Sequence, residues 1–395
     1  MASEQAIPHP NWLRLAVGGG AALFVGMGLG RFSYSAMIPA LIADGGLTPA
    51  QAGYVAAFNL AGFLLGVLVQ PRLRAIAGER GTLQLSLIVA LVCLIASIGV
   101  IPAPWAFHWL AFWRGLVGIA VGVIMVQALA VVTRAAPRGK LGLASGIVFT
   151  GVGGGILLSG LAIPRLLTFD LTSAWSGVAV IGAVAVGVGF WGLAAPIPDA
   201  GTKPDTSTDD SRKSDRKAAR YLVAAQTLFV VGLIPHTIFW VDYLVRGLAH
   251  DMAFGGYHWA LFGLGALTGT ALWGWLADRI GFRAGLVLVF LSLAVGSVLP
   301  VLETAGWALV FSSLVVGAQP GCSALLSART QQIFGNQAMP KIWRRMTLVG
   351  GIGQGIGGYL LVALFDATGS YTAVFMVGGA AMAAGAVISV CLKPN

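Results

Sequence analysis

The feature that most constrains this chain is a series of apolar stretches, each roughly 20 residues long, that recurs along almost its whole length. A stretch of this length crosses the hydrocarbon core of a bilayer as one helix. Only 10% of the residues are charged and 57% are hydrophobic, which leaves too little polar surface for a soluble protein. The sequence therefore predicts an all-α membrane protein with twelve transmembrane helices, spans 1 to 12: 12–39, 50–70, 82–101, 105–133, 142–167, 173–195, 221–245, 256–277, 284–302, 306–334, 346–365 and 371–391.

The chain resembles itself when it is shifted by 203 residues. Six spans separate the matched positions, so both copies run in the same direction. This predicts a parallel repeat of two six-helix halves, residues 1–195 and 220–395, joined by a charged linker at 196–219. The matched pairs include Gly62 with Gly265, Gly66 with Gly269, Gly78 with Gly281, and Arg80 with Arg283.

The basic residues predict the orientation of the spans. If the N-terminus is cytoplasmic, most of the 24 Lys and Arg residues fall in cytoplasmic segments, and only Arg165 and Arg246 fall in outer loops. We therefore expect a plasma (inner) membrane protein with both termini in the cytoplasm. The net charge of +10 is not a sign of nucleic-acid binding, because the basic residues lie in short loops between apolar spans.

The loop between spans 8 and 9 carries a motif. Its sequence, Gly-Trp-Leu-Ala-Asp-Arg-Ile-Gly-Phe-Arg from Gly274 to Arg283, resembles the signature cytoplasmic loop of the major facilitator superfamily. The resemblance implies an inner gate in which Asp278 faces a helix N-terminus and Arg279 and Arg283 complete a charge network. The first half has Ala75 where the repeat places Asp278, which predicts an asymmetric gate. The alternative is a basic loop with an incidental acid.

Two further stretches resemble the YbfB/YjiJ-type branch of this superfamily. They are Gly-Leu-Gly-Arg-Phe at 28–32 in span 1 and Pro-His-Thr-Ile-Phe-Trp-Val-Asp-Tyr at 235–243 in span 7. The resemblance implies a secondary transporter whose two halves alternate access to a central site. It does not imply a substrate.

Arg31 and Arg114 are charges deep inside spans 1 and 4. A charge in hydrocarbon costs several kcal/mol unless it faces protein, water or a ligand. Counted from the prolines that mark the outer ends, both arginines lie roughly 12–15 Å deep, near the midplane. We expect them to bind substrate, with Tyr34 and Asn59 beside them. The alternative for Arg114 is a structural bond to a backbone carbonyl.

Span 7 contributes the remaining candidates. His236 and Trp240 share one face, and the repeat puts His236 at the depth of Arg31. We expect both to bind substrate, and we expect Asp242 or His236 to carry a coupled proton. The spacing of Arg114 and Gly118 resembles the fourth-helix motif of the superfamily, which implies a part for Arg114 in proton coupling or substrate binding. In the alternative interpretations, Asp242 only pairs with Arg246, and His236 only binds a carbonyl freed by Pro235.

Two arginines against one intramembrane acid leave excess positive charge, so the sequence predicts a small organic anion of the carboxylate type as substrate, with proton coupling. Alternatives are a multidrug or metabolite exporter with proton antiport, and a membrane sensor that transports nothing. An enzyme is disfavoured because no nucleophile–base set, metal cluster or nucleotide motif is evident. We expect no cofactor, metal or nucleic-acid partner, and a protein that functions as a monomer in the bilayer. The three cysteines lie in apolar runs and offer no disulfide or metal spacing, and His258 is interpreted as a bystander.

Overall fold

The computed structural model describes residues 11–99, 103–137, 140–197 and 213–392. These residues are nearly all helical and contain no strand. Most of the linker predicted at 196–219 lies outside the described residues. The next described residue, Lys213, is the first residue of helix α7 (Lys213–Gly232).

Eleven helices of the described chain are long and apolar enough to cross a bilayer. One of them, α3 (Pro49–Ala96), contains spans 2 and 3, because the chain reverses at Gly78, whose φ of 68° lies in the left-handed region. Twelve spans result, which confirms the predicted number. Span 1 is continuous through α1 (Trp12–Leu23), η1 (Phe24–Phe32) and α2 (Ser33–Ala43).

The other spans follow in chain order. Spans 4 to 6 are α4 (Ala103–Ala135), α5 (Leu141–Leu167) and α6 (Leu171–Leu193). Span 7 consists of α7 followed by η3 (Pro235–Phe239), α8 (Trp240–Asp242) and η4 (Tyr243–Gly247), and spans 8 and 9 are α9 (Met252–Ile280) and α10 (Phe282–Leu302). Span 10 is α11 (Gly306–Gly317) with the start of α12 (Pro320–Thr368), span 11 is the rest of α12, and span 12 is α13 (Tyr371–Val390).

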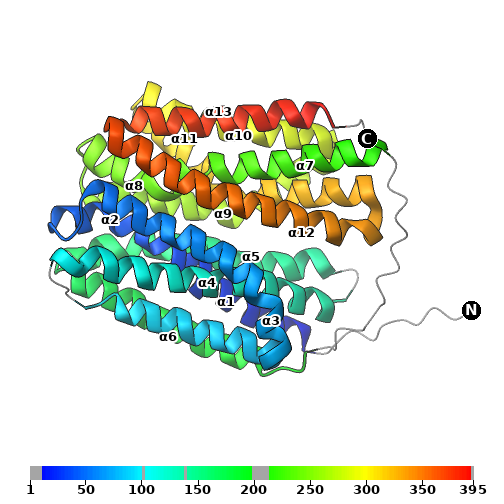
Figure 1. The fold of residues 1–395 in the computed structure, drawn as a ribbon, viewed down its shortest axis with the longest axis horizontal. Coiled ribbons are helices and arrows are strands. Elements are labelled where there is room, and N and C mark those ends of the chain that lie inside the picture. The colour runs from blue at the N-terminus through cyan, green and yellow to red at the C-terminus, as the bar shows by residue number, and fades with distance from the viewer. Residues whose placement is uncertain (1–10, 100–102, 138–139, 198–212, 393–395) are drawn as a thin grey trace, which may run out of the picture.

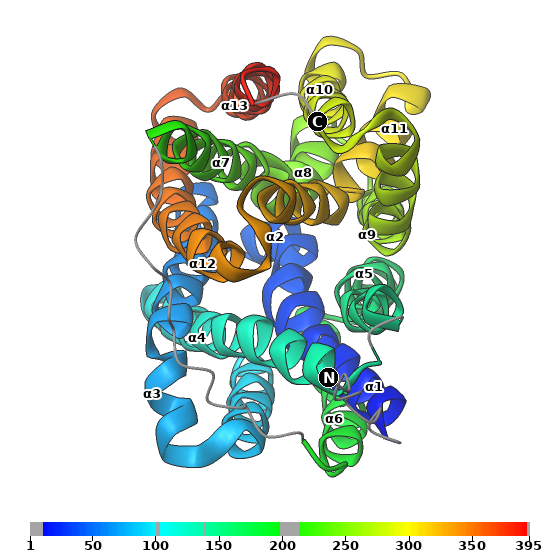
Figure 2. The ribbon, with the colours of Figure 1, turned by 90° about the vertical axis from the view of Figure 1, so that its right-hand side faces the viewer.

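The helices form two groups, α1–α6 and α7–α13, which lie one above the other in Figures 1 and 2. Helix α6 ends and helix α7 begins at the same end of the molecule, on the right in Figure 1, which we call the linker end. The opposite end is the far end.

Glycines bring equivalent helices together in the two groups. A Cβ on Gly62 would lie 2.1 Å from the carbonyl oxygen of Gly115, and one on Gly265 would lie 2.3 Å from that of Leu314. Helix α3 therefore packs on α4 as α9 packs on α11, with the backbones in direct contact. Gly281 repeats the positive φ of Gly78, at 87°. The predicted parallel repeat is confirmed by this shared packing.

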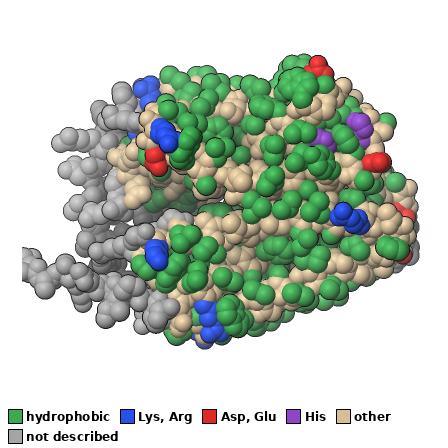
Figure 3. Space-filling model, turned by 180° about the vertical axis from the view of Figure 1, so that it is seen from behind, with side chains coloured by type: hydrophobic (Ala, Val, Ile, Leu, Met, Phe, Trp, Pro, Cys, Tyr) green, Lys and Arg blue, Asp and Glu red, His purple; other side chains and the backbone are tan. Residues whose placement is uncertain are grey.

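The two groups meet along α5 and α9 and along α3 and α12. Gly160 packs against the backbone of Gly256, and Tyr54 contacts Tyr359 with ring centroids 5.3 Å apart. The outer surface is mainly apolar. Figure 3 shows hydrophobic side chains spread over the middle of one face, with charged side chains toward its two ends. This distribution suits a protein surrounded by lipid.

Because α3 approaches α4 so closely, even a methyl side chain at their contact should destabilise the protein. Gly62→Ala should destabilise the protein by about 2 kcal/mol, because the added methyl group meets a backbone oxygen that cannot move aside. Thermal unfolding of the detergent-purified protein measures the loss. Gly187→Ala is the control, since nothing lies within 4 Å of its Cβ position. Equal midpoints for the two variants would contradict the packing described here.

Candidate functional site

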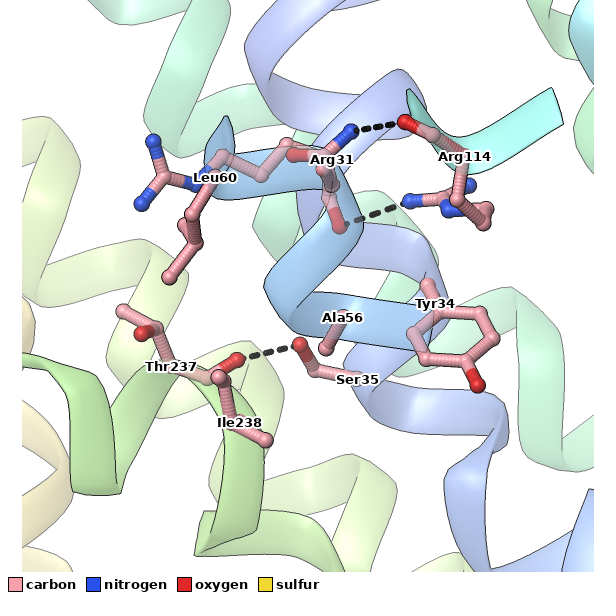
Figure 4. Close-up of a pocket in the computed structure, with 9 residues that line it drawn as sticks. Arg31, Tyr34, Ser35, Ala56, Leu60, Arg114, Thr237 and Ile238 are labelled. Carbon is pink, nitrogen blue, oxygen red and sulfur yellow. Dashed lines mark hydrogen bonds between the residues drawn. The ribbon is translucent and has the colours of Figure 1, made fainter. Parts of the chain in front are cut away.

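A pocket lies between the two groups of helices at the level of η1 and η3 (Figure 4). Four of the residues predicted to bind substrate line it together: Arg31, Tyr34, Asn59 and Arg114. The other two predicted residues, His236 and Trp240, do not. The complete lining is Arg31, Tyr34, Ser35, Ala56, Asn59, Leu60, Arg114, Thr237 and Ile238.

Arg31 belongs to η1, a nine-residue stretch of π-helix. Its backbone hydrogen bonds span five residues instead of four, which widens the turn and alters which carbonyls are paired. Glycines allow neighbouring helices to approach the widened backbone. A Cβ on Gly28 would lie 2.7 Å from the Cα of Gly155, and one on Gly30 would lie 2.9 Å from the Val117 side chain.

Arg114 binds the backbone of η1. Its Nη2 donates to the carbonyl oxygens of Gly30 at 2.5 Å and Arg31 at 3.1 Å. The Arg114 guanidinium carbon lies 4.9 Å from the centre of the Tyr34 ring, and the backbone carbonyl of Arg114 accepts a 3.0 Å hydrogen bond from Asn59 Nδ2. The side chain is only 1% exposed. The geometry therefore favours the structural alternative for Arg114, an arginine that holds backbone carbonyls.

The guanidinium of Arg31 is different. It is 8% exposed and has neither a hydrogen bond nor an ion pair with any described residue. The rings of Phe32 and Phe63 lie beside it, with their centres 5.3 and 5.7 Å from the guanidinium carbon. Figure 4 shows the guanidinium groups of Arg31 and Arg114 pointing in different directions. A buried guanidinium without an acceptor is costly, so an acceptor from outside the described chain would stabilise this one.

Asp242 does not reach Arg31. Its Oδ2 accepts a 2.5 Å hydrogen bond from Tyr371 Oη, and its Oδ1 lies 3.5 Å from Arg246 Nε. The carboxylate is 2% exposed and ties span 7 to α13. The pair with Arg246, which was the alternative interpretation of Asp242, is thus present.

His236 and Trp240 face into the second half, away from the pocket, and both are fully buried. Ser312 Oγ lies 2.8 Å from His236 Nε2 and donates its single proton to the carbonyl of Gly296. Nε2 must therefore donate to Ser312, and in the neutral imidazole Nδ1 then carries no proton. The Trp240 ring stacks on His236 at 4.9 Å and donates to Ser313 Oγ. These two side chains therefore do not line the pocket that contains Arg31.

Three residues that line the pocket or bind the serines of α11 were not identified from the sequence. His258, interpreted as a bystander, is buried with its Nδ1 2.9 Å from Ser313 Oγ. Thr237 and Ile238 line the pocket and are the repeat counterparts of Tyr34 and Ser35. The shift of 203 residues could have identified both, because positions equivalent under the repeat face the central axis from opposite sides.

The four predicted gate residues lie at the linker end. Asp278 and Arg279 are exposed, and the Arg279 guanidinium lies 3.6 Å from the centre of the Trp275 ring. Arg283 donates to the carbonyl of Val390, at the end of α13. Asp278 has no ion pair with any described residue, so the expected network between Asp278 and the two arginines is not formed in this structure.

The equivalent turn of the first half does contain a charge network. Glu79 pairs with Arg134 of α4 and lies 3.5 Å from Arg74. Arg80 donates at 3.0 Å to the carbonyl of Ala195, just beyond α6, as Arg283 does at the end of α13. Glu79 lies four positions after Ala75, the counterpart of Asp278, so the shift of 203 residues does not align the two acids.

The described residues hold no group of three or more His, Cys, Asp and Glu side chains that suits a metal ion.

A family model described as "Uncharacterised MFS-type transporter YbfB" matches residues 23–390. No curated protein matches the chain.

Two solved structures are similar over nearly their whole length. One is described as the crystal structure of a D-xylose-proton symporter, with a TM-score of 0.78, 13% identity, and 98% of each chain covered. The other is the xylose transporter XylE from E. coli in an inward open conformation, with a TM-score of 0.74, 14% identity, and coverage of 97% of this chain and 96% of that one. These similarities confirm the predicted fold.

The different surroundings of the two arginines predict opposite effects on stability. Arg114→Met should lower the free energy of unfolding by about 2 kcal/mol, because two backbone carbonyls lose a charged donor. Arg31→Met should leave stability unchanged or raise it, because an unpaired buried charge is replaced by an apolar group. Thermal unfolding in detergent compares the two. A larger loss for Arg31→Met would show that Arg31 has a structural partner.

Proposed function

Because the chain belongs to the YbfB-type family of major facilitator transporters, we propose that it is a secondary transporter of a small organic anion. One observation supports an anionic substrate above all others. The guanidinium of Arg31 is buried in a pocket between the halves and has no acceptor among the described residues. A carboxylate from the substrate would supply the missing charge and accept two parallel hydrogen bonds.

The composition of the pocket supports an anion over the alternative of a cationic drug. Its nine lining residues include two arginines and no acid. A lipophilic cation would meet uncompensated like charge in a medium of low dielectric constant. A neutral substrate would leave Arg31 without a counter-charge. Exporters of organic cations are therefore poorly supported, whereas export of an organic anion is compatible with the same site.

We propose Asp242 as the group that carries a coupled proton. It is buried, its hydrogen bond with Tyr371 joins span 7 to α13, and its pair with Arg246 lies within span 7. His236 is less suitable, because a proton on Nδ1 would have no acceptor among the described residues. Arg114 is held by carbonyls. The similar D-xylose-proton symporter carries protons by its description, which supports coupling here by analogy.

The two halves, residues 1–195 and 220–395, are the proposed moving units, and the linker at 196–219 connects them. The contacts of Ser35 with Thr237 and of Tyr54 with Tyr359 join the halves. We propose that the inner gate forms at the linker end when the halves adopt the other of their two arrangements. Its residues are Gly274, Asp278, Arg279 and Arg283. The basic loops support cytoplasmic termini in an inner membrane, and we propose that a monomer is sufficient for transport.

The role of Arg31 is tested by binding. Purified protein is screened by thermal shift against lactate, succinate and gluconate as carboxylates, inorganic phosphate, and tetraphenylphosphonium as a lipophilic cation. We expect a carboxylate to stabilise the wild type, and Arg31→Met to abolish that shift. Arg165→Met is the matched control, because its guanidinium is exposed and donates only to its own helix. Stabilisation by the cation, with Arg31→Met unaffected, would contradict the proposed function.

Asp242→Asn tests coupling. The amide keeps the size of the side chain but cannot gain or lose a proton. Proteoliposomes containing this variant should still exchange labelled substrate across the membrane, whereas accumulation driven by an imposed pH gradient should be lost. Tyr371→Phe serves as control, because it removes the hydrogen bond but keeps the carboxyl group. Wild-type accumulation by Asp242→Asn would rule out this residue as the proton carrier.

A further inference from the structure

We infer that the anion recognised by the pocket carries at least one hydroxyl group, so that the substrate class is a hydroxycarboxylate. This inference rests on the proposed function, because it specifies the substrate of the same site. The observation that carries it is a second buried group without a partner, the side-chain oxygen of Asn59.

Asn59 is 2% exposed and lines the pocket together with Arg31. Its Nδ2 donates to the backbone carbonyl of Arg114 at 3.0 Å. This bond fixes the orientation of the amide, since a flipped amide would place Oδ1 against a carbonyl oxygen. Oδ1 is therefore an acceptor without a donor among the described residues. A buried acceptor left unpaired is costly, so the site requires a hydrogen-bond donor from the ligand.

The hydroxyl groups that line the pocket cannot supply that donor. Tyr34 Oη donates to the carbonyl of Ala52 at 3.0 Å, Ser35 Oγ donates to that of Thr237, and Thr237 Oγ1 donates to that of Ile234 at 3.2 Å. Each hydroxyl has a single proton, so none of these three groups has a proton left for Asn59 Oδ1. The pocket thus combines the donors of Arg31 with one amide oxygen that has no donor among the described residues.

A ligand that satisfies both kinds of group has an anionic end and a donor. Hydroxyl and ammonium groups both donate. An ammonium group would lie beside two arginines with no acid in the lining, and like charges repel strongly there. A hydroxyl group donates to Asn59 without adding charge. Simple carboxylates leave Asn59 unpaired, and uncharged polyols leave Arg31 unpaired, so the pocket favours a molecule with both functions.

A matched series of three-carbon ligands tests the inference: propionate has a carboxylate only, lactate adds one hydroxyl, glycerate adds two, and glycerol has hydroxyls only. Gluconate and hexanoate repeat the comparison with six carbons. Affinities for the purified wild type are measured by thermal shift and calorimetry. Within at least one chain length we expect the hydroxy acid to bind about tenfold more tightly or better than its deoxy analogue, and glycerol not to bind.

Asn59→Leu should remove the preference for the hydroxyl while carboxylate binding through Arg31 persists. Gln70→Leu is the matched control: it removes another buried amide from α3, one that bonds to Gln127 and does not line the pocket, so the preference should remain.

The wild-type comparison alone can overturn the inference, even if Asn59→Leu does not fold. Equal affinity for propionate and lactate and for hexanoate and gluconate, all lost in Arg31→Met, would reject the hydroxyl requirement and leave the anion site intact. Binding that survives in Arg31→Met, or an absence of binding by every carboxylate, would reject the proposed function as well.

Discussion

The hydrogen bonds from Arg114 to the carbonyls of Gly30 and Arg31 are the interaction on which the pocket depends. In a bilayer, backbone groups have no water to bind, so a π-helical stretch that leaves carbonyls underused must find donors inside the protein. Arg114 supplies them from α4. By fixing the backbone of Arg31 it also fixes where the Arg31 side chain begins, and it consumes none of the donors of that side chain. One arginine thus holds the site in shape, and the other remains available for a ligand.

Span 7 gives the second half a comparable division between two faces. Thr237 and Ile238 line the pocket, whereas His236 and Trp240 bind the serines of α11. A few residues further on, Asp242 holds α13 through Tyr371. A change in charge at Asp242 would therefore act on the same short, irregular helix that forms one wall of the pocket. In the proposed mechanism, proton and substrate need not share a side chain to be coupled, because both would bias the position of this helix.

The fold could be predicted from the sequence because its determinants are local and repeated. The length of an apolar stretch specifies a span. The equivalent glycines Gly62 and Gly265 specify the same close helix contact once in each half. Within the site, Arg31, Tyr34, Asn59 and Arg114 were identifiable because polar groups in hydrocarbon are rare. The spacing of His236 and Trp240 indicated a shared face but not the direction of that face. Each π-helical turn adds a residue and rotates the remainder of the helix by about 100°, so a regular helix wheel fails in η1 and η3.

The repeat also explains how a symmetric scaffold forms an asymmetric pocket. Tyr34 and Ser35 on one side of the pocket oppose their counterparts Thr237 and Ile238 on the other. Arg31, however, has Ile234 as its counterpart, a fully buried aliphatic side chain. The first half therefore holds the charge and the amide, while the second half contributes a methyl-bearing hydroxyl side chain and an aliphatic one. A hydroxycarboxylate bound here would direct its carboxylate and hydroxyl toward spans 1, 2 and 4 and its carbon skeleton toward span 7. Release of its polar end then requires movement of the first half relative to span 7, which is the movement that alternating access supplies.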